Sequence, residues 1–129
     1  MSIASKGAVL VVCAIVFVTG SSARAVRISV DIAPGATAAD SGHAHAGLRA
    51  GMASEGFDDV SPQGPSASTL WVVRSSVSSM GPKLTLSARL LGVADGKLVG
   101  RESVLCAPEA LEDSARAVGV RLARRAPPE

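Results

Sequence analysis

The chain has 129 residues, 47% of them hydrophobic, and a formal net charge of +2. Only 2% of the residues are aromatic and tyrosine is absent, so the core must be aliphatic and few rings are available to stack on sugars or bases. This length suits one domain that buries roughly two-thirds of its unfolded surface.

The first 25 residues have the layout of a secretory signal peptide. Lys6 supplies a positive charge, residues 7–18 are an uninterrupted apolar run, and the segment ends in Ala23-Arg24-Ala25. Signal peptidases cleave after such an A-x-A sequence, so we expect cleavage between Ala25 and Val26. The apolar run is shorter than the roughly 20 residues of a membrane-spanning helix. An uncleaved anchor is the alternative, and it would be the chain's link to a membrane.

Removal of this segment leaves a charge-balanced chain. Lys6 and Arg24 lie within it, so residues 26–129 carry 11 basic and 11 acidic side chains. Nucleic-acid binding requires clustered positive charge that displaces counterions, and we therefore expect no nucleic-acid partner. The remaining cysteine, Cys106, cannot form an internal disulfide. A buried, unpaired thiol is the favoured interpretation, and a disulfide to another chain is the alternative.

A strand and a helix are predicted first. Residues 26–32 alternate apolar and polar side chains, which is typical of a half-buried strand. Residues 36–54 are rich in alanine and lack proline, which favours a helix. Gly47 and Gly51 lie beside the thin apolar stripe of this helix, and we expect them to let it pack closely on a sheet.

A short strand and a three-stranded meander follow. Residues 57–60 predict a second strand, and the loop 61–68 is too short for a helical crossover. The second strand is therefore expected at a sheet edge, or leading directly into the next strand. Residues 69–105 predict three strands joined by two tight turns, and the middle strand, with apolar residues at 84, 86, 88 and 90, shows the clearest alternation.

The register between the last two strands has two alternatives. A two-residue loop at Asp-Gly would place Arg89 opposite Glu102, which is the better electrostatic pairing. A three-residue loop with a bulge would place Arg89 opposite Arg101 and keep Leu86 and Val104 on one face. The sequence leaves both registers open.

The chain closes with an amphipathic helix. Pro108 suits its first turn, acidic residues follow near its start, and arginines cluster near its end. We expect one domain, residues 26–125, followed by a disordered tail, residues 126–129. The predicted order is β-α-β-β-β-β-α, an α+β fold in which an antiparallel meander is covered by two helices as a two-layer sandwich.

Residues 69–99 resemble a known family pattern. They are similar to the strand, glycine turn and "sArLvdvatGklvw" meander of the TolB amino-terminal-like superfamily, which FlgO-like and CsgG-like envelope proteins share. Ala88-Arg89-Leu90 and Gly96-Lys97 match at the residue level, whereas Gly92 and Gly100 depart from the family's Asp and Trp. The resemblance implies the same fold and a non-enzymatic docking domain in the Gram-negative cell envelope.

His43 and His45 offer the principal alternative chemistry, a metal site. On a helix, residues two apart point to different sides of the axis, whereas on an extended segment both could face one ion. Two imidazoles also fall short of the three or four ligands of a zinc site. Residues 26–129 contain no G-x-S-x-G or S-x-x-K motif for a serine nucleophile and no glycine-rich phosphate loop. We therefore expect no enzyme, no metal and no cofactor.

These inferences predict an exported, periplasmic or secreted, interaction module of the bacterial cell envelope that binds a protein partner. The candidate partner surface consists of Trp71, Arg89 and Arg101. The alternative is a small periplasmic hydrolase or metal-binding protein that uses His43 and His45. The sequence leaves the identity of the partner and the oligomeric state open.

Overall fold

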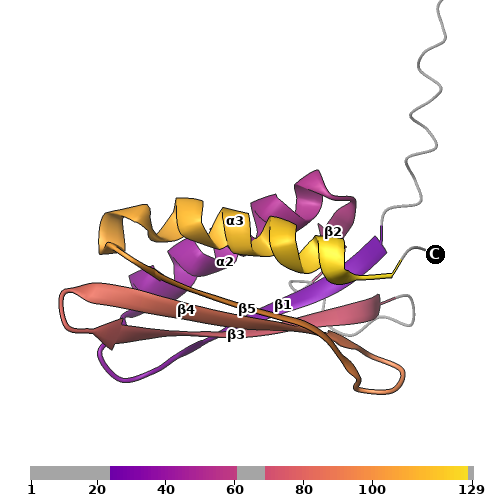
Figure 1. The fold of residues 1–129 in the computed structure, drawn as a ribbon, viewed down its shortest axis with the longest axis horizontal. Helices are drawn as coiled ribbons and strands as arrows, with labels where there is room; N and C mark the ends of the chain where they lie inside the picture. The colour runs from indigo at the N-terminus through magenta and orange to yellow at the C-terminus, as the bar shows by residue number, and fades with distance from the viewer. Residues whose placement is uncertain (1–23, 61–68, 128–129) are drawn as a thin grey trace, which may run out of the picture.

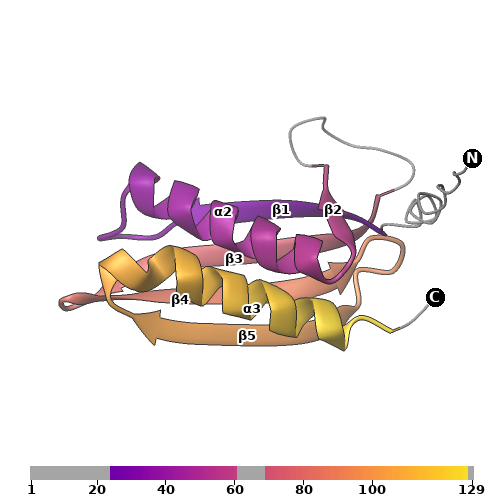
Figure 2. The ribbon, with the colours of Figure 1, turned by 90° about the horizontal axis from the view of Figure 1, so that it is seen from above.

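The computed structural model describes residues 24–60 and 69–127. These residues form one five-stranded sheet with both helices packed against the same face, as Figure 1 and Figure 2 show. The strand order is β2-β1-β3-β4-β5. The predicted two-layer α+β architecture is therefore confirmed, while most of the predicted signal peptide and the loop 61–68 lie outside the described residues.

Strand β1 (Arg24–Ile32) lies inside the sheet, between the short edge strand β2 (Phe57–Asp59) and the long strand β3 (Thr69–Met80). It runs parallel to both neighbours. The edge position of β2 is one of the two predicted alternatives. The sequence did not predict that β1 would separate β2 from the meander, nor that β1 would begin before the expected cleavage position.

Strands β4 (Lys83–Gly92) and β5 (Leu98–Cys106) complete an antiparallel meander with β3. Arg89 lies opposite Arg101, and the register shifts between Leu90 and Leu91. Of the two predicted registers, the structure therefore has the bulged one. The loop between the strands spans residues 93–97 and is longer than either loop that the sequence predicted.

Helix α2 (Ala38–Ser54) begins at a capping box that the sequence analysis overlooked. The Asp40 N–H donates to Thr37 Oγ1 at 3.1 Å, and the Thr37 N–H donates to Asp40 Oδ2 at 3.0 Å. Two backbone donors that would otherwise lack a partner are thus satisfied at the helix start. The helix begins at Ala38, and the expected start at residue 36 was too early.

Helix α3 (Leu111–Arg125) follows a 3-10 turn, η2 (Pro108–Ala110). Acidic residues lie in its first turn and arginines in its last turn, which complements the helix dipole. No helix in the described part of the chain is long and apolar enough to cross a membrane. The apolar stripe that the sequence predicted for this helix is buried as expected: Leu111, Ala115, Val118 and Leu122.

The two helices approach each other through glycines, not through larger side chains. A Cβ at Gly47 or Gly51 would overlap the α3 carbonyl oxygens of Glu112 and Arg116, respectively. A Cβ at Gly119 of α3 would lie 2.7 Å from the Leu48 carbonyl oxygen. Gly47 and Gly51 are therefore positions of close approach, but the element they approach is α3 and not the sheet that the sequence led us to expect.

The sheet has one covered face and one open face. Along β4, Leu84, Leu86, Ala88 and Leu90 are buried beneath the helices, and the residues between them are exposed or half-buried. The core lies between the helices and this covered face. Below the sheet in Figure 1, no element of the described chain covers the other face.

Candidate interaction surface

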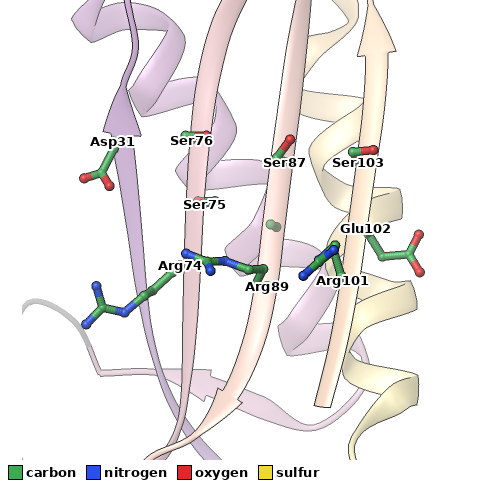
Figure 3. A pocket seen from close by; sticks show the side chains of 10 residues that line it. Asp31, Arg74, Ser75, Ser76, Ser87, Arg89, Arg101, Glu102 and Ser103 are labelled. Carbon is green, nitrogen blue, oxygen red and sulfur yellow. The ribbon is translucent and has the colours of Figure 1, made fainter. Parts of the chain in front are cut away.

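Three arginines lie directly opposite one another on neighbouring strands of the open face. Arg74 of β3 pairs with Arg89 of β4, and Arg89 pairs with Arg101 of β5. All three side chains are exposed. They lean in the same direction, towards β1, and do not converge on one point (Figure 3). We call these three residues the arginine row.

No ion pair within the described part of the chain neutralises the arginine row. No hydrogen bond or ion pair joins any of its three guanidinium groups to another described residue. Like charges directly opposite each other across strands are destabilising. The row is therefore electrostatically unfavourable in the free chain, and an anionic partner would relieve the repulsion.

A row of hydroxyl groups lies beside the arginine row. Ser76, Ser87 and Ser103 are cross-strand neighbours on β3, β4 and β5, and Asp31 of β1 lies opposite Ser76. We call these four residues the serine row. Together with the arginine row it lines an open hollow of about 430 Å³ (Figure 3).

An apolar row lies on the other side of the arginines. Val72 of β3 pairs with Leu91 of β4, and Leu91 pairs with Leu98 of β5. Val72 and Leu91 are half-buried, and Leu98 is 42% exposed. The open face therefore presents an apolar, a cationic and a hydroxyl row side by side.

The repulsion within the arginine row leads to a stability prediction. We expect Arg89→Thr to raise the free energy of unfolding by about 0.5 kcal/mol at low salt, because it removes the middle charge and places a β-branched residue in a strand. Urea denaturation at several salt concentrations measures the effect. The gain should shrink as salt rises, since ions screen exposed charges, and a variant less stable than the wild type at low salt would contradict this account.

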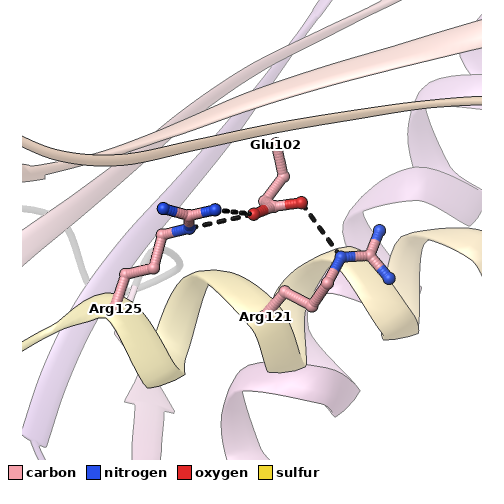
Figure 4. Close-up of polar contacts among 3 residues, drawn as sticks. All are labelled: Glu102, Arg121 and Arg125. Atoms are coloured by element: carbon pink, nitrogen blue, oxygen red, sulfur yellow. Dashed lines mark hydrogen bonds and ion pairs between the residues drawn. The ribbon is translucent and has the colours of Figure 1, made fainter.

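Glu102 of β5 faces the opposite way, towards α3. Arg121 Nε donates to its Oε1 at 2.9 Å, and Arg125 Nε donates to its Oε2 at 2.9 Å (Figure 4). The hydrogen bonds from Arg125 and Arg121 lower the pKa of the Glu102 carboxyl below its ordinary value of 4.5. This cluster ties β5 to the last turns of α3 and leaves Glu102 unable to neutralise the arginine row.

The lowered pKa of Glu102 predicts how stability changes in acid. A carboxyl with a depressed folded-state pKa stabilises the fold above its ordinary pKa and loses this contribution as pH falls through the folded-state value. We expect Glu102→Gln to cost about 1 kcal/mol at pH 7, a small value because both arginines are half exposed. Thermal melts between pH 7 and pH 3 should show the two proteins converging in acid, and a pH-independent difference would contradict the ion-pair origin.

The two histidines of the alternative metal site make separate contacts. His43 Nδ1 lies 3.2 Å from Glu112 Oε1 on α3, whereas His45 Nε2 lies 3.1 Å from Asp59 Oδ2 on β2. Within residues 24–60 and 69–127, no group of three or more His, Cys, Asp or Glu side chains is placed to hold a metal ion. The histidines instead link α2 to α3 and to β2.

Trp71 does not belong to the same surface as Arg89 and Arg101. It packs against the buried core on the covered face, and the Arg24 guanidinium carbon lies 5.3 Å from its ring centroid. With Pro127 and the β4–β5 loop it lines a second hollow of about 430 Å³ at the end of the sheet. The structure therefore unites two of the three predicted surface residues and separates the third.

Arg74 is the residue that the sequence analysis missed. The sequence shows it only as the one charged residue in a long strand, and its position beside Arg89 depends on the β3–β4 register. Cys106 is buried, as its favoured interpretation expected, because it is 8% exposed.

Comparison with known proteins shows a shared fold. No protein-family model matches the chain, and no curated protein sequence matches it significantly. Among solved structures, TolB from Acinetobacter baumannii superposes with a TM-score of 0.59 at 12% identity, over 75% of this chain and 26% of that one. The chain therefore spans about a quarter of that structure.

Two further structures match over most of their own length. The PelC dodecamer from Paraburkholderia phytofirmans has a TM-score of 0.55 at 12% identity, over 80% of this chain and 87% of that one. Lipoprotein GNA1162 from Neisseria meningitidis has a TM-score of 0.51 at 12% identity, over 66% and 80%. The fold implied by the sequence resemblance is thus shared with solved bacterial TolB, PelC and lipoprotein structures.

Proposed function

We propose that the chain is exported and acts as a non-enzymatic interaction module of the bacterial cell envelope. In this proposal a protein partner binds the open face of the sheet. The observation that carries it is the arginine row, three exposed cations on adjacent strands that have no ion-pair partner among the described residues. Charged side chains that repel one another within one chain are candidates for contacts with opposite charges on another chain.

Two other observations support the proposal. The signal-peptide layout of residues 1–25 supports export. The fold supports an envelope role, because a protein described as a lipoprotein shares it. PelC is described as a dodecamer, so a second copy of this chain is one partner that the test must recognise.

Site-specific photocrosslinking in the native bacterium tests the proposal. A photoreactive amino acid at position 89 should give a defined covalent adduct in the exported fraction. The matched control is position 49, since Arg49 is an exposed arginine on α2, on the other side of the molecule. An adduct of twice the chain's mass would identify a second copy as the partner. Absence of any adduct at position 89, or equal adducts at both positions, would contradict binding through the open face.

A further inference from the structure

We infer that the partner presents an acidic amphipathic helix, which lies along the arginine row and across the strands. This inference rests on the proposed function, because it assumes that the open face is the binding surface. It adds the chemical character and the secondary structure of the bound segment.

The spacing of the arginines favours a helix. Neighbouring strands are about 4.8 Å apart, so Arg74, Arg89 and Arg101 supply positive charges at steps of about 5 Å. Side chains three and four residues apart on a helix lie about 5–6 Å apart. Carboxylates repeated at this spacing along one helix face would each meet one guanidinium group.

The orientation of the arginines argues against a single compact anion. A phosphate or sulfate ion is bound best by donors that converge on it, whereas these three side chains lean in parallel towards β1 (Figure 3). Each guanidinium therefore offers its own planar donor edge, which suits a separate carboxylate. The array fits a line of single charges.

The neighbouring rows specify where the partner is apolar. On β3 and β4, the residue of the apolar row lies two residues from the arginine of the same strand, about 7 Å in a regular strand. On β5, the bulge adds one residue between Leu98 and the arginine. A helix is about 10 Å across and would cover both rows. Asp31 lies at the β1 end of the serine row. Its carboxylate disfavours carboxylates of the partner over the serine row. The partner's apolar residues are therefore expected over Leu91 and Leu98.

A binding measurement with a designed peptide tests this inference. The probe is a fluorescent helical peptide with Glu at i, i+4 and i+7 and Leu on the adjacent face, titrated with the purified mature protein at low salt. We expect the triple variant Arg74→Gln/Arg89→Gln/Arg101→Gln to weaken binding at least tenfold. Leu98→Ser should weaken it severalfold, and Arg49→Gln should leave it unchanged.

Several outcomes would overturn the inference. One is an absence of binding. Two others are equal binding of a peptide with Lys in place of Glu and equal binding of an acidic peptide without Leu. The last is full displacement by millimolar inorganic phosphate, which would indicate a simple oxyanion site. Each is distinguishable from failure of the proposed function. A crosslinked adduct at position 89 without binding of the acidic helix would keep the interaction module and reject the helix as its ligand.

Independently, the contacts of Arg24 point to signal-peptide cleavage after Ala23, not after Ala25. The Arg24 N–H donates to the Gly56 carbonyl oxygen at 2.9 Å, and its guanidinium donates to the Pro127 carbonyl oxygen at 2.6 Å. The same guanidinium carbon lies 4.8 Å from the Phe57 ring centroid. A mature chain that began at Val26 would lack these contacts.

Cleavage after Ala23 would keep β1 whole. Arg24 and Ala25 form two of the register pairs between β1 and β2, opposite Phe57 and Asp58. The segment Ser21-Ser22-Ala23 carries small residues at the two positions that signal peptidase reads. It is therefore a second acceptable cleavage sequence, and it leaves Arg24 as the first residue.

The intact mass of the exported protein identifies the cleavage position. We expect a mature chain that begins at Arg24. A chain that begins at Val26, or one that retains the full leader, would overturn this assignment. As a second arm, purified chains that start at Arg24 and at Val26 are compared by thermal melting, and equal melting temperatures would show that Arg24 contributes nothing to the fold.

Discussion

Gly51→Ala is expected to lower the free energy of unfolding by about 1–3 kcal/mol, even though alanine is the better helix former. The added Cβ would overlap the Arg116 carbonyl oxygen on α3 and would lie 2.9 Å from the Val120 backbone nitrogen. Both obstacles are backbone atoms, so no side-chain rotation can make room. The helices would have to separate, which opens gaps in the core beneath them. Chemical denaturation of the purified protein measures the change.

Gly42→Ala is the matched control for this substitution. Gly42 lies on the same helix, and no atom lies within 4 Å of the position that its Cβ would take. Alanine should therefore stabilise the protein there by up to about 1 kcal/mol, the difference in helix propensity. If both variants were stabilised equally, the close approach of α2 and α3 would be refuted.

Leu86→Ala is expected to cost about 2–5 kcal/mol, the usual range for a buried leucine. Leu86 is fully buried on the covered face of β4, between the sheet and the helices. The substitution removes buried apolar surface and leaves a cavity that the surrounding elements fill only in part. Denaturant unfolding should show a lower midpoint with an unchanged slope.

Leu105→Ala provides the same chemical change on the other face. Leu105 of β5 is 54% exposed on the open face, so its truncation should change stability by no more than about 0.5 kcal/mol. The contrast tests the division of the sheet into two faces. Equal losses for the two variants would show that the open face is buried in the folded protein, for example by self-association, and sedimentation analysis of the wild type would then reveal the oligomer.

Elements defined by local patterns were predicted well from the sequence. The alternation of Leu84, Leu86 and Leu90 identified β4 and its buried face, and the apolar spacing of α3 identified its buried stripe. Such patterns reflect the 2.0 and 3.6 residue periods of the backbone, which are properties of a short segment. The bulged β4–β5 register was among the predicted alternatives, but pair electrostatics pointed to the other one. Packing of Leu86 and Val104 on the covered face outweighed the repulsion between Arg89 and Arg101.

Contacts between distant segments could not be predicted in the same way. Gly47 and Gly51 were correctly seen as positions of close approach, but the sequence did not show that α3 was the neighbour. Trp71 was predicted to share a surface with Arg89 and Arg101, but strand alternation places it on the other face of the sheet. Arg74 was overlooked because only the β3–β4 register makes it a neighbour of Arg89.

By itself, the sequence established which segments form most of the strands and helices, which residues of β4 and α3 point to the core, and that residues 26–129 carry equal numbers of basic and acidic side chains, because each of these depends on composition or on a local period. Only the tertiary structure decided how these acidic and basic side chains are distributed between the two faces of the sheet. Glu102 is bound by Arg121 and Arg125 on the covered side, while Arg74, Arg89 and Arg101 are left together on the open face. Strand order and register bring these residues together over long sequence separations, and a one-residue slip would send every side chain to the opposite face.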